Sequence, residues 1–274
     1  MTNVNRRVLP GFSLTLGYTV FYLSVLVIVP IVACFVKAAS LSFDEFWGAV
    51  WTERARAAYL LTFGASFVAA VVNLVLGALI AWVLVRYDFP GKRIVDSLVD
   101  LPLALPTAVG GLVYAALYVK NGWLGQFLVP LGIQGAYTRL GIVLVLVFVG
   151  LPFMVRTVQP VLEDFDPEAE EASASLGATR LQTFLHVILP ALFPAMITGF
   201  ALAFARSVGE YGSVVFISGN MPFKTEIAPI LIVARLEEFA YGEATAIAVV
   251  LLVISFSLLI LINLLENWSR RHAA

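Results

Sequence analysis

The sequence predicts an all-α integral membrane protein with six transmembrane helices. Composition is the first reason: 61% of the 274 residues are hydrophobic and only 13% are charged, where soluble domains carry about 25% charged residues. The second reason is that six apolar runs are each long enough to cross a hydrocarbon core of ~30 Å as a helix. These runs do not alternate between apolar and polar residues, which argues against a membrane β-barrel.

The six runs follow one another with polar segments between them, and the whole chain, residues 1–274, is expected to form one transmembrane domain. The first run has 23 residues, whereas a secretory signal has an apolar core of about 7–15, so we expect it to be a retained helix. We place the spans near residues 14–36, 59–85, 98–119, 140–160, 191–217 and 244–265.

The third run contains residues that break or loosen a helix, namely Pro102, Pro106, Gly110 and Gly111. A discontinuous helix inside a bundle can turn backbone donors towards a substrate. The alternative is a kink that serves packing alone. Thr107, directly after Pro106, is therefore a candidate for the translocation pathway.

The fifth run carries two ionisable residues, Arg206 and Glu210. Such groups are rare inside spans and are functional candidates, and a spacing of four places them on one helix face, where they can pair. Ser207 and Tyr211 beside them suit either tight packing or the lining of a pathway. Arg206 would attract a divalent oxyanion, with Glu210 moderating that attraction. Alternatively, the two form a structural pair that neutralises itself.

A polar, acidic segment, residues 161–190, separates the fourth and fifth runs. It predicts two short helices, because Asp166 can cap the first, Gly177 can end it, and Thr179 can open the second. One interpretation is an amphipathic helix that lies on the membrane. Such helices usually carry Lys and Arg, so the acidic, small-residue composition favours docking to a partner protein.

With six spans, both termini lie on the same side of the membrane. If that side is the cytoplasm, nine Lys and Arg residues lie inside and seven outside, which is a small excess in the direction of the positive-inside rule. The nine are Arg6, Arg7, Arg86, Lys92, Arg93, Arg156, Arg180, Arg270 and Arg271.

Part of the polar segment resembles the EAA motif of ABC importer permeases, a family of binding-protein-dependent transporters. The likeness rests on Glu171-Ala172-Ser173, on Gly177 six residues after Glu171, and on Ile188-Leu189-Pro190. In this family the motif forms a coupling helix that sits in a cleft of a cytoplasmic ATPase. The resemblance thus implies ATPase coupling by Glu171, Ala172, Ser173 and Gly177, and it places 161–190 and both termini in the cytoplasm. Ser173 stands where the family often has Ala.

Further stretches at 105–111, 121–125 and 209–222 are similar to the T-subunit branch of the sulfate/thiosulfate permeases. This resemblance implies a type I ABC importer fold with six spans. It also implies translocation of sulfate or thiosulfate across the bacterial inner membrane by alternating access. A molybdate or tungstate permease of the same fold is an alternative. An ion-coupled secondary anion transporter is an alternative from a different class.

The sequence has no phosphate-binding loop of the G-x-x-x-x-G-K-[ST] type, no nucleophile elbow and no HExxH motif. We therefore expect no catalytic residue and no cofactor on this chain, with ATP and Mg²⁺ bound by a partner. A single cysteine, Cys34, and two distant histidines suggest no metal site, and the net charge of −1 gives no reason to expect nucleic acid.

Several partners are implied by the resemblance. They are two cytoplasmic ATPase subunits, a second permease subunit of the different W type, and a periplasmic sulfate-binding protein. All would assemble around a multi-pass chain embedded in the lipid bilayer.

Overall fold

A computed structural model describes residues 12–273, with side chains from 12 to 264 except that of residue 13. Over these residues the chain is helical and contains no strand. Five helical stretches are long and apolar enough to cross a membrane, and the helix over Thr107–Tyr118 is a shorter apolar one. Arg6 and Arg7 lie outside the described residues, as do the side chains of Arg270 and Arg271.

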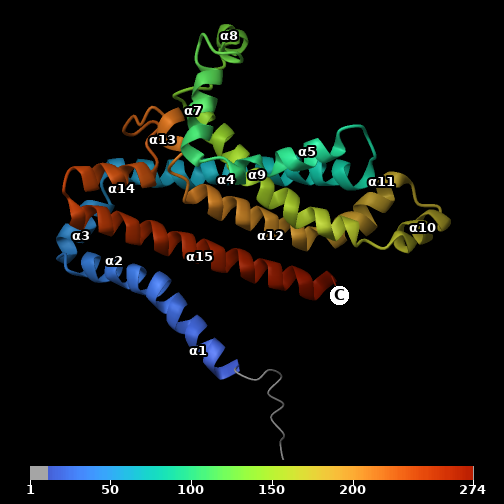
Figure 1. Ribbon diagram of the computed structural model, residues 1–274, viewed down its shortest axis with the longest axis horizontal. Helices are drawn as coiled ribbons and strands as arrows, with labels where there is room; N and C mark the ends of the chain where they lie inside the picture. The colour runs from blue at the N-terminus through green and yellow to red at the C-terminus, as the bar shows by residue number, and fades with distance from the viewer. Residues whose placement is uncertain (1–11, 274) are drawn as a thin grey trace, which may run out of the picture.

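Long helices form the body of the molecule and lie along its longest axis (Figure 1). They are α4 (Glu53–Arg86), α9 (Arg139–Glu163), α12 (Leu189–Val208) and α15 (Tyr241–Ala273). A further long stretch slants away from the body and consists of α1 (Phe12–Leu23), a π-helical turn (Ser24–Ile28) and α2 (Val29–Ala39). The short helices are α3 (Phe43–Val50), α5 (Lys92–Val99), α6 (Leu101–Ala104), α7 (Thr107–Tyr118), α8 (Gly125–Leu128), η2 (Val129–Leu131), α10 (Pro167–Ser175), α11 (Arg180–Thr183), η3 (Phe184–Ile188), α13 (Val214–Ile217) and α14 (Ala228–Glu237).

Helices α4, α9 and α12 form the core, and small residues allow their backbones to approach closely. Gly150 of α9 faces α4, where an added Cβ would lie 2.6 Å from the Asn73 side chain. Gly77 of α4 faces Met154 in the same way. Helix α15 packs on α12, and α2 packs on α15, while α1 has no buried residue over the range that the structure describes.

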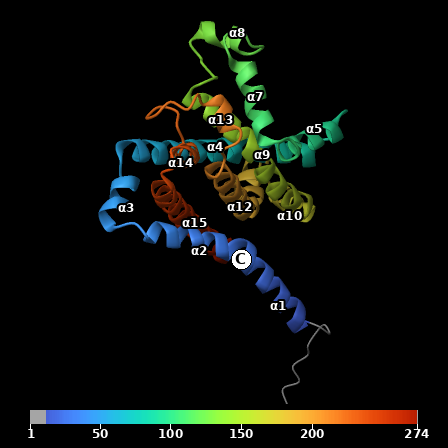
Figure 2. The ribbon, with the colours of Figure 1, turned by 60° about the vertical axis from the view of Figure 1, so that its left-hand side comes forward.

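The predicted third span, 98–119, is not one helix. Helix α6 ends at Ala104, Leu105 and Pro106 are extended, and α7 begins at Thr107. Proline causes this break, because it lacks an N–H group and disfavours the helical conformation in the residue before it. The third run therefore forms a discontinuous helix. Helix α7 leaves the bundle steeply (Figures 1 and 2).

The predicted fifth span, 191–217, is also interrupted. Helix α12 ends at Val208, residues 209–213 form a turn, and α13 begins at Val214. The spacing of four predicts that Arg206 and Glu210 share one helical face. Glu210 instead lies beyond the end of the helix. One reason is local: the Glu210 side chain accepts a hydrogen bond from the Ser213 N–H at 2.8 Å, which competes with the helical bonding pattern.

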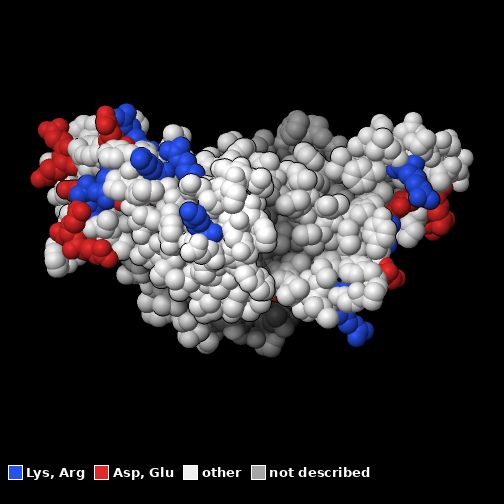
Figure 3. Space-filling view, turned by 90° about the horizontal axis from the view of Figure 1, so that it is seen from above, with Lys and Arg blue, Asp and Glu red and all other residues white. Residues whose placement is uncertain are grey.

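On the face that Figure 3 shows, charged side chains gather towards the two ends of the molecule, and few lie between them. Helices α3 and α14 lie at one end, and α10 and α11 lie at the other (Figure 1). An uncharged zone around parallel apolar helices is what a hydrocarbon core requires. The protein is therefore a multi-pass membrane protein whose long axis crosses the bilayer.

Candidate coupling segment and translocation site

The predicted coupling segment has the helix ends that the sequence indicates. Asp166 Oδ1 accepts a hydrogen bond from the Glu168 N–H at 2.9 Å and so caps α10. Gly177 ends the segment's first helix with a φ of +84°, which is costly for residues other than glycine. Thr179 and Gln182 form a capping box at the start of α11, with Gln182 Oε1 2.8 Å from the Thr179 backbone nitrogen.

Helix α10 projects at one extreme end of the molecule (Figure 1) and has no buried residue. Glu171 and Ala172 are exposed, and Leu176 just beyond the helix is 89% exposed. Ser173 points inward instead, because its hydroxyl lies 3.0 Å from that of Thr183 and ties α10 to α11. Three of the four predicted coupling residues, Glu171, Ala172 and Gly177, therefore lie on an open surface, while Ser173 positions the helix.

Arg86 connects this segment to the core, a contact that the sequence did not indicate. Its guanidinium forms an ion pair with Glu170 of α10. Periodicity could not reveal this pair, because its members are 84 residues apart in the chain.

Glu210 organises the turn after α12. Its side chain is 2% exposed, and its Oε2 accepts a hydrogen bond from Arg206 Nη1 at 2.5 Å. Its Oε1 accepts bonds from the backbone N–H and the hydroxyl of Ser213, at 2.8 and 2.7 Å. Arg206 is 32% exposed, and the structure shows no second polar contact for it among the described residues. Both oxygens of Glu210 thus accept hydrogen bonds within the protein, whereas Arg206 keeps N–H donors free.

The same turn packs against the start of α7. A Cβ added to Gly212 would collide with Thr107 Oγ1, and one added to Gly111 would collide with the Ser213 carbonyl. The two broken helices therefore bring Thr107, Arg206, Glu210 and the exposed Tyr211 into one neighbourhood. Ser207 is not at its surface, because it is 2% exposed among packed helices.

Asn73 is a buried polar residue that the sequence reasoning missed. It is 0% exposed on α4, opposite Gly150, and neither amide atom has a hydrogen-bond partner among the described residues. A polar group inside the helix packing of a membrane protein is a functional candidate. The available signal was a lone amide within the apolar run 59–85.

Arg156 holds the segment that leads into the broken third span. On α9, it donates to both carboxylate oxygens of Asp100, at 2.9 and 2.6 Å, and to Asp96 Oδ1 at 2.6 Å. The bidentate contact is geometrically specific. It fixes the end of α5, so that the break before α7 has a defined position.

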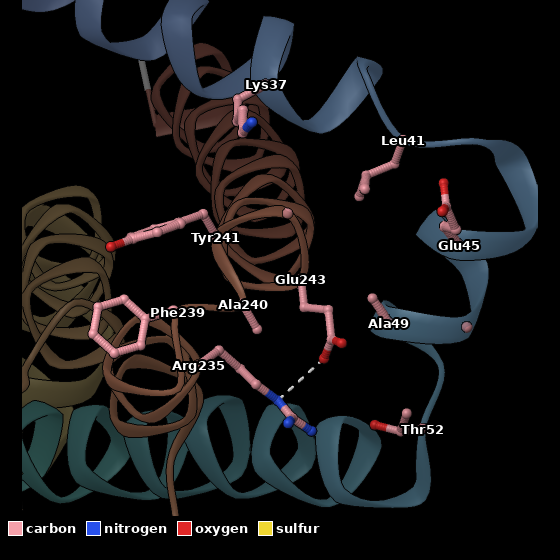
Figure 4. A pocket seen from close by; sticks show the side chains of 12 residues that line it. Lys37, Leu41, Glu45, Ala49, Thr52, Arg235, Phe239, Ala240, Tyr241 and Glu243 are labelled. Carbon is pink, nitrogen blue, oxygen red and sulfur yellow. Dashed lines mark ion pairs between the residues drawn. The ribbon is translucent and has the colours of Figure 1, made fainter.

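A cavity of about 670 Å³ opens at the end of the molecule opposite α10. Arg235 and Glu243 of its lining form an ion pair at 3.3 Å, and Lys37 and Glu45 line it from α2 and α3 (Figure 4). Hydrogen bonds from the Ser42 backbone N–H and hydroxyl lower the pKa of Glu45 below its ordinary value. Two cations and two carboxylates balance, so the lining has no net attraction for an anion.

The parallel apolar helices, the ion pair at a helix break and the exposed, doubly capped polar segment define a membrane permease. Residues 73–271 match the family described as "Binding-protein-dependent transport system inner membrane component", and the chain belongs to this family. Its members are membrane components of transport systems and are not themselves enzymes. The predicted family and the predicted all-α membrane fold are confirmed.

The relatives that match over nearly the whole length include the following two. The chain is 54% identical over 255 residues to the "Sulfate transport system permease protein CysT" of Synechocystis sp., an alignment that covers 93% of this chain and 89% of the relative. It is 49% identical over 263 residues to the protein of the same name from Salmonella typhimurium, covering 96% and 95%.

A solved structure gives the fold independently. This is the bacterial ABC transporter involved in the import of the acidic polysaccharide alginate, with a TM-score of 0.78, 16% identity and 95% of both chains covered. At this identity the likeness concerns the fold, which is that of an ABC importer permease.

Proposed function

We propose that this chain is the permease subunit of an ATP-driven importer that moves sulfate or thiosulfate across the bacterial inner membrane by alternating access. The observation that supports sulfate as the substrate is the 54% identity to a permease named for sulfate transport. The exposed, capped α10 supports coupling to a separate ATPase, since nothing in the described part of the chain covers its outer face.

The proposed assembly follows from the two ends of the molecule. Two cytoplasmic ATPase subunits bind ATP and Mg²⁺, and one of them receives Glu171, Ala172 and Gly177 of this chain, which places 161–190 and both termini in the cytoplasm. A periplasmic sulfate-binding protein docks at the opposite end. A second permease of the W type covers the exposed apolar residues of α7. In this assembly residues 1–274 act as one transmembrane domain.

The proposed pathway runs past the contact between α7 and the turn 209–213. Arg206 offers free N–H donors, and the start of α7 presents backbone N–H groups that favour an anion. Thr107 and Tyr211 contribute hydroxyls beside them, while Ser207 supports the helix from inside. Glu210 holds Arg206 in place and offsets its charge, so that a divalent anion binds and is released again.

Uptake of radiolabelled sulfate tests the substrate. In cells lacking their own sulfate permeases, co-expression with the ATPase, the second permease and the binding protein is expected to give saturable uptake. An excess of thiosulfate should reduce that uptake at least five-fold. The same concentration of molybdate should leave the uptake within two-fold of its value without competitor. Stronger competition by molybdate would favour the molybdate alternative. Uptake that persists without the ATPase and collapses with the proton gradient would favour a secondary transporter.

Co-purification tests the docking of α10. We expect Gly177→Pro to reduce the amount of ATPase that co-purifies in mild detergent at least ten-fold, because proline cannot adopt the φ of +84° found there. Gly132→Pro is the matched control: its φ is +82°, it too has open space around it, and it lies in the loop after α8. ATPase retained by Gly177→Pro, or lost equally from both variants, would contradict docking through this segment.

A further inference from the structure

We propose that Arg86 is a positioning residue that makes α4 a strut between the two ends of the molecule, so that movement of α10 is passed to the outer loop 218–227. The proposal rests on the proposed function in one respect, namely that an ATPase moves α10. The two ends of α4 are attached by the Arg86–Glu170 pair and by a second ion pair, Arg54–Glu226.

The inner end of the strut is a single side chain held between aromatic rings. Arg86 is the last residue of α4, and its guanidinium carbon lies 5.1 Å from the centre of the Trp82 ring and 6.0 Å from that of Phe165. A guanidinium over an aromatic face is attracted electrostatically. Phe165 directly precedes the cap of α10, so Arg86 contacts both the helix and the residue before it.

The same cluster reaches the start of α12. The Trp82 ring meets the ring of Phe184 edge to face, with centres 5.4 Å apart and planes at 87°. Phe184 begins the π-helical turn that leads into α12, and such turns often mark functional positions. The last two turns of α4 therefore touch α10 and the π-helical turn together.

Chain connectivity alone would pass the movement of α10 to α9 and α12. Helix α10 follows α9 through residues 164–166 and continues through α11 into α12. Helix α4 has no such connection, and Arg86–Glu170 is the one polar contact between α4 and α10 among the described residues. Packing on α9 and α12 couples the body of α4 to these helices, and the Arg86–Glu170 pair adds the direct polar connection between the inner end of α4 and α10.

The outer end of α4 is attached more rigidly. Arg54 binds Glu226 through two hydrogen bonds, Nε to Oε2 at 2.7 Å and Nη2 to Oε1 at 2.6 Å. Thr62 Oγ1 accepts a further bond from the Ala228 N–H at 2.8 Å. The 34 residues of α4 give a helix about 51 Å long, which joins α10 to the segment before α14.

The two ion pairs differ in a way that suits a moving joint. Arg54–Glu226 uses the planar fork of the guanidinium, which fixes orientation as well as distance. Arg86 uses one nitrogen, and its Nε is buried with no hydrogen-bond partner among the described residues. A single hydrogen bond allows the two side chains to rotate relative to each other while the contact is kept. The Arg86–Glu170 pair can thus follow α10, while the Arg54–Glu226 pair moves the loop 218–227 together with α4.

The test compares variants of the joint in the assembled complex. Arg86→Gln removes the charge and is expected to lower sulfate uptake per ATP hydrolysed at least five-fold. Arg86→Lys keeps a single charged contact and should retain at least half. The reversed pair, Arg86→Glu with Glu170→Arg, should recover uptake that each single reversal loses. Lys92→Gln is the control, because its partner Asp88 is fully exposed.

Two further readouts separate this role from folding and from docking. All variants should keep the thermal stability and the co-purifying ATPase of the native chain. A spin label is attached at Met221→Cys in a Cys34→Ser background, and a second label is attached to the partner permease. The distance between the two labels should change between nucleotide states in the native and Arg86→Lys proteins. In Arg86→Gln the change should be less than half as large.

Equal movement of the label in Arg86→Gln, or a reversed pair that stays as inactive as its single members, would overturn the strut. Loss of ATPase from Glu170→Arg would do so as well, since Glu170 would then be a docking residue. Label movement is measured without sulfate. If the label in the native complex moves but the complex takes up no sulfate, the substrate proposal is contradicted. The proposal that α4 transmits the movement is then unaffected.

Discussion

Glu210→Ala is expected to abolish sulfate uptake and to lower the free energy of unfolding by about 2 kcal/mol, because buried donors lose their acceptor and the partly exposed Arg206 loses its ion-pair partner. Glu210 is 2% exposed, and Arg206 depends on its carboxylate. The Ser213 N–H and hydroxyl lose their acceptor as well. Unfolding in detergent and uptake in cells measure the two effects.

Neutralising both residues separates the two roles of the pair. Arg206→Gln with Glu210→Gln should recover more than half of the stability lost in Glu210→Ala, since neither charge is then left alone. Uptake should nevertheless stay at least ten-fold below native if Arg206 contacts the anion. Native uptake in the stable double variant would assign the pair to structure alone. Glu238→Ala is the surface control, because its carboxylate is half exposed.

Gly111→Ala is expected to lower the free energy of unfolding by about 2 kcal/mol, in the range found when a packed core is overfilled. The added Cβ would collide with the Ser213 backbone, which cannot move aside as a flexible side chain can. Helix α7 would separate from the turn 209–213, and we expect uptake to fall at least ten-fold. Unfolding in detergent and uptake again give the measurements.

The neighbouring glycine supplies a matched control. A Cβ on Gly110 would lie 3.6 Å from the Phe148 ring, which is an ordinary contact. Gly110→Ala should therefore leave uptake within two-fold of native, and it should slightly stabilise α7, because alanine favours helices over glycine. Equal losses in the two variants would show that helix flexibility matters here, and not the contact between α7 and the turn.

The sequence determined the features that depend on neighbouring residues. Apolar runs predicted an all-α membrane fold, since a helix satisfies its own backbone in lipid. Asp166 and Thr179 identified the starts of α10 and α11 because a capping side chain bonds backbone groups two or three residues away. Pro106 likewise marked the break before α7 through its own geometry.

The sequence misplaced the end of the fifth span. Apolar residues resume at 214–217 after a short polar interruption, so the run 191–217 reads as one helix. The chain turns there because the Glu210 carboxylate binds Ser213 and because the turn packs on Gly111. Only the first of these contacts is local. Pairing between Arg206 and Glu210 was predicted correctly, but from a helix that does not continue that far.

Tertiary structure alone decided which distant side chains meet. Segments far apart in the chain are joined by the contacts of Arg86 with Glu170, of Arg156 with Asp100 and of Thr107 with Gly212. In the membrane, a helix such as α4 is apolar on nearly every side, so its pattern does not show which face its neighbours cover. The covered face is set by where small residues let two backbones approach, and that becomes visible only when both helices are in place.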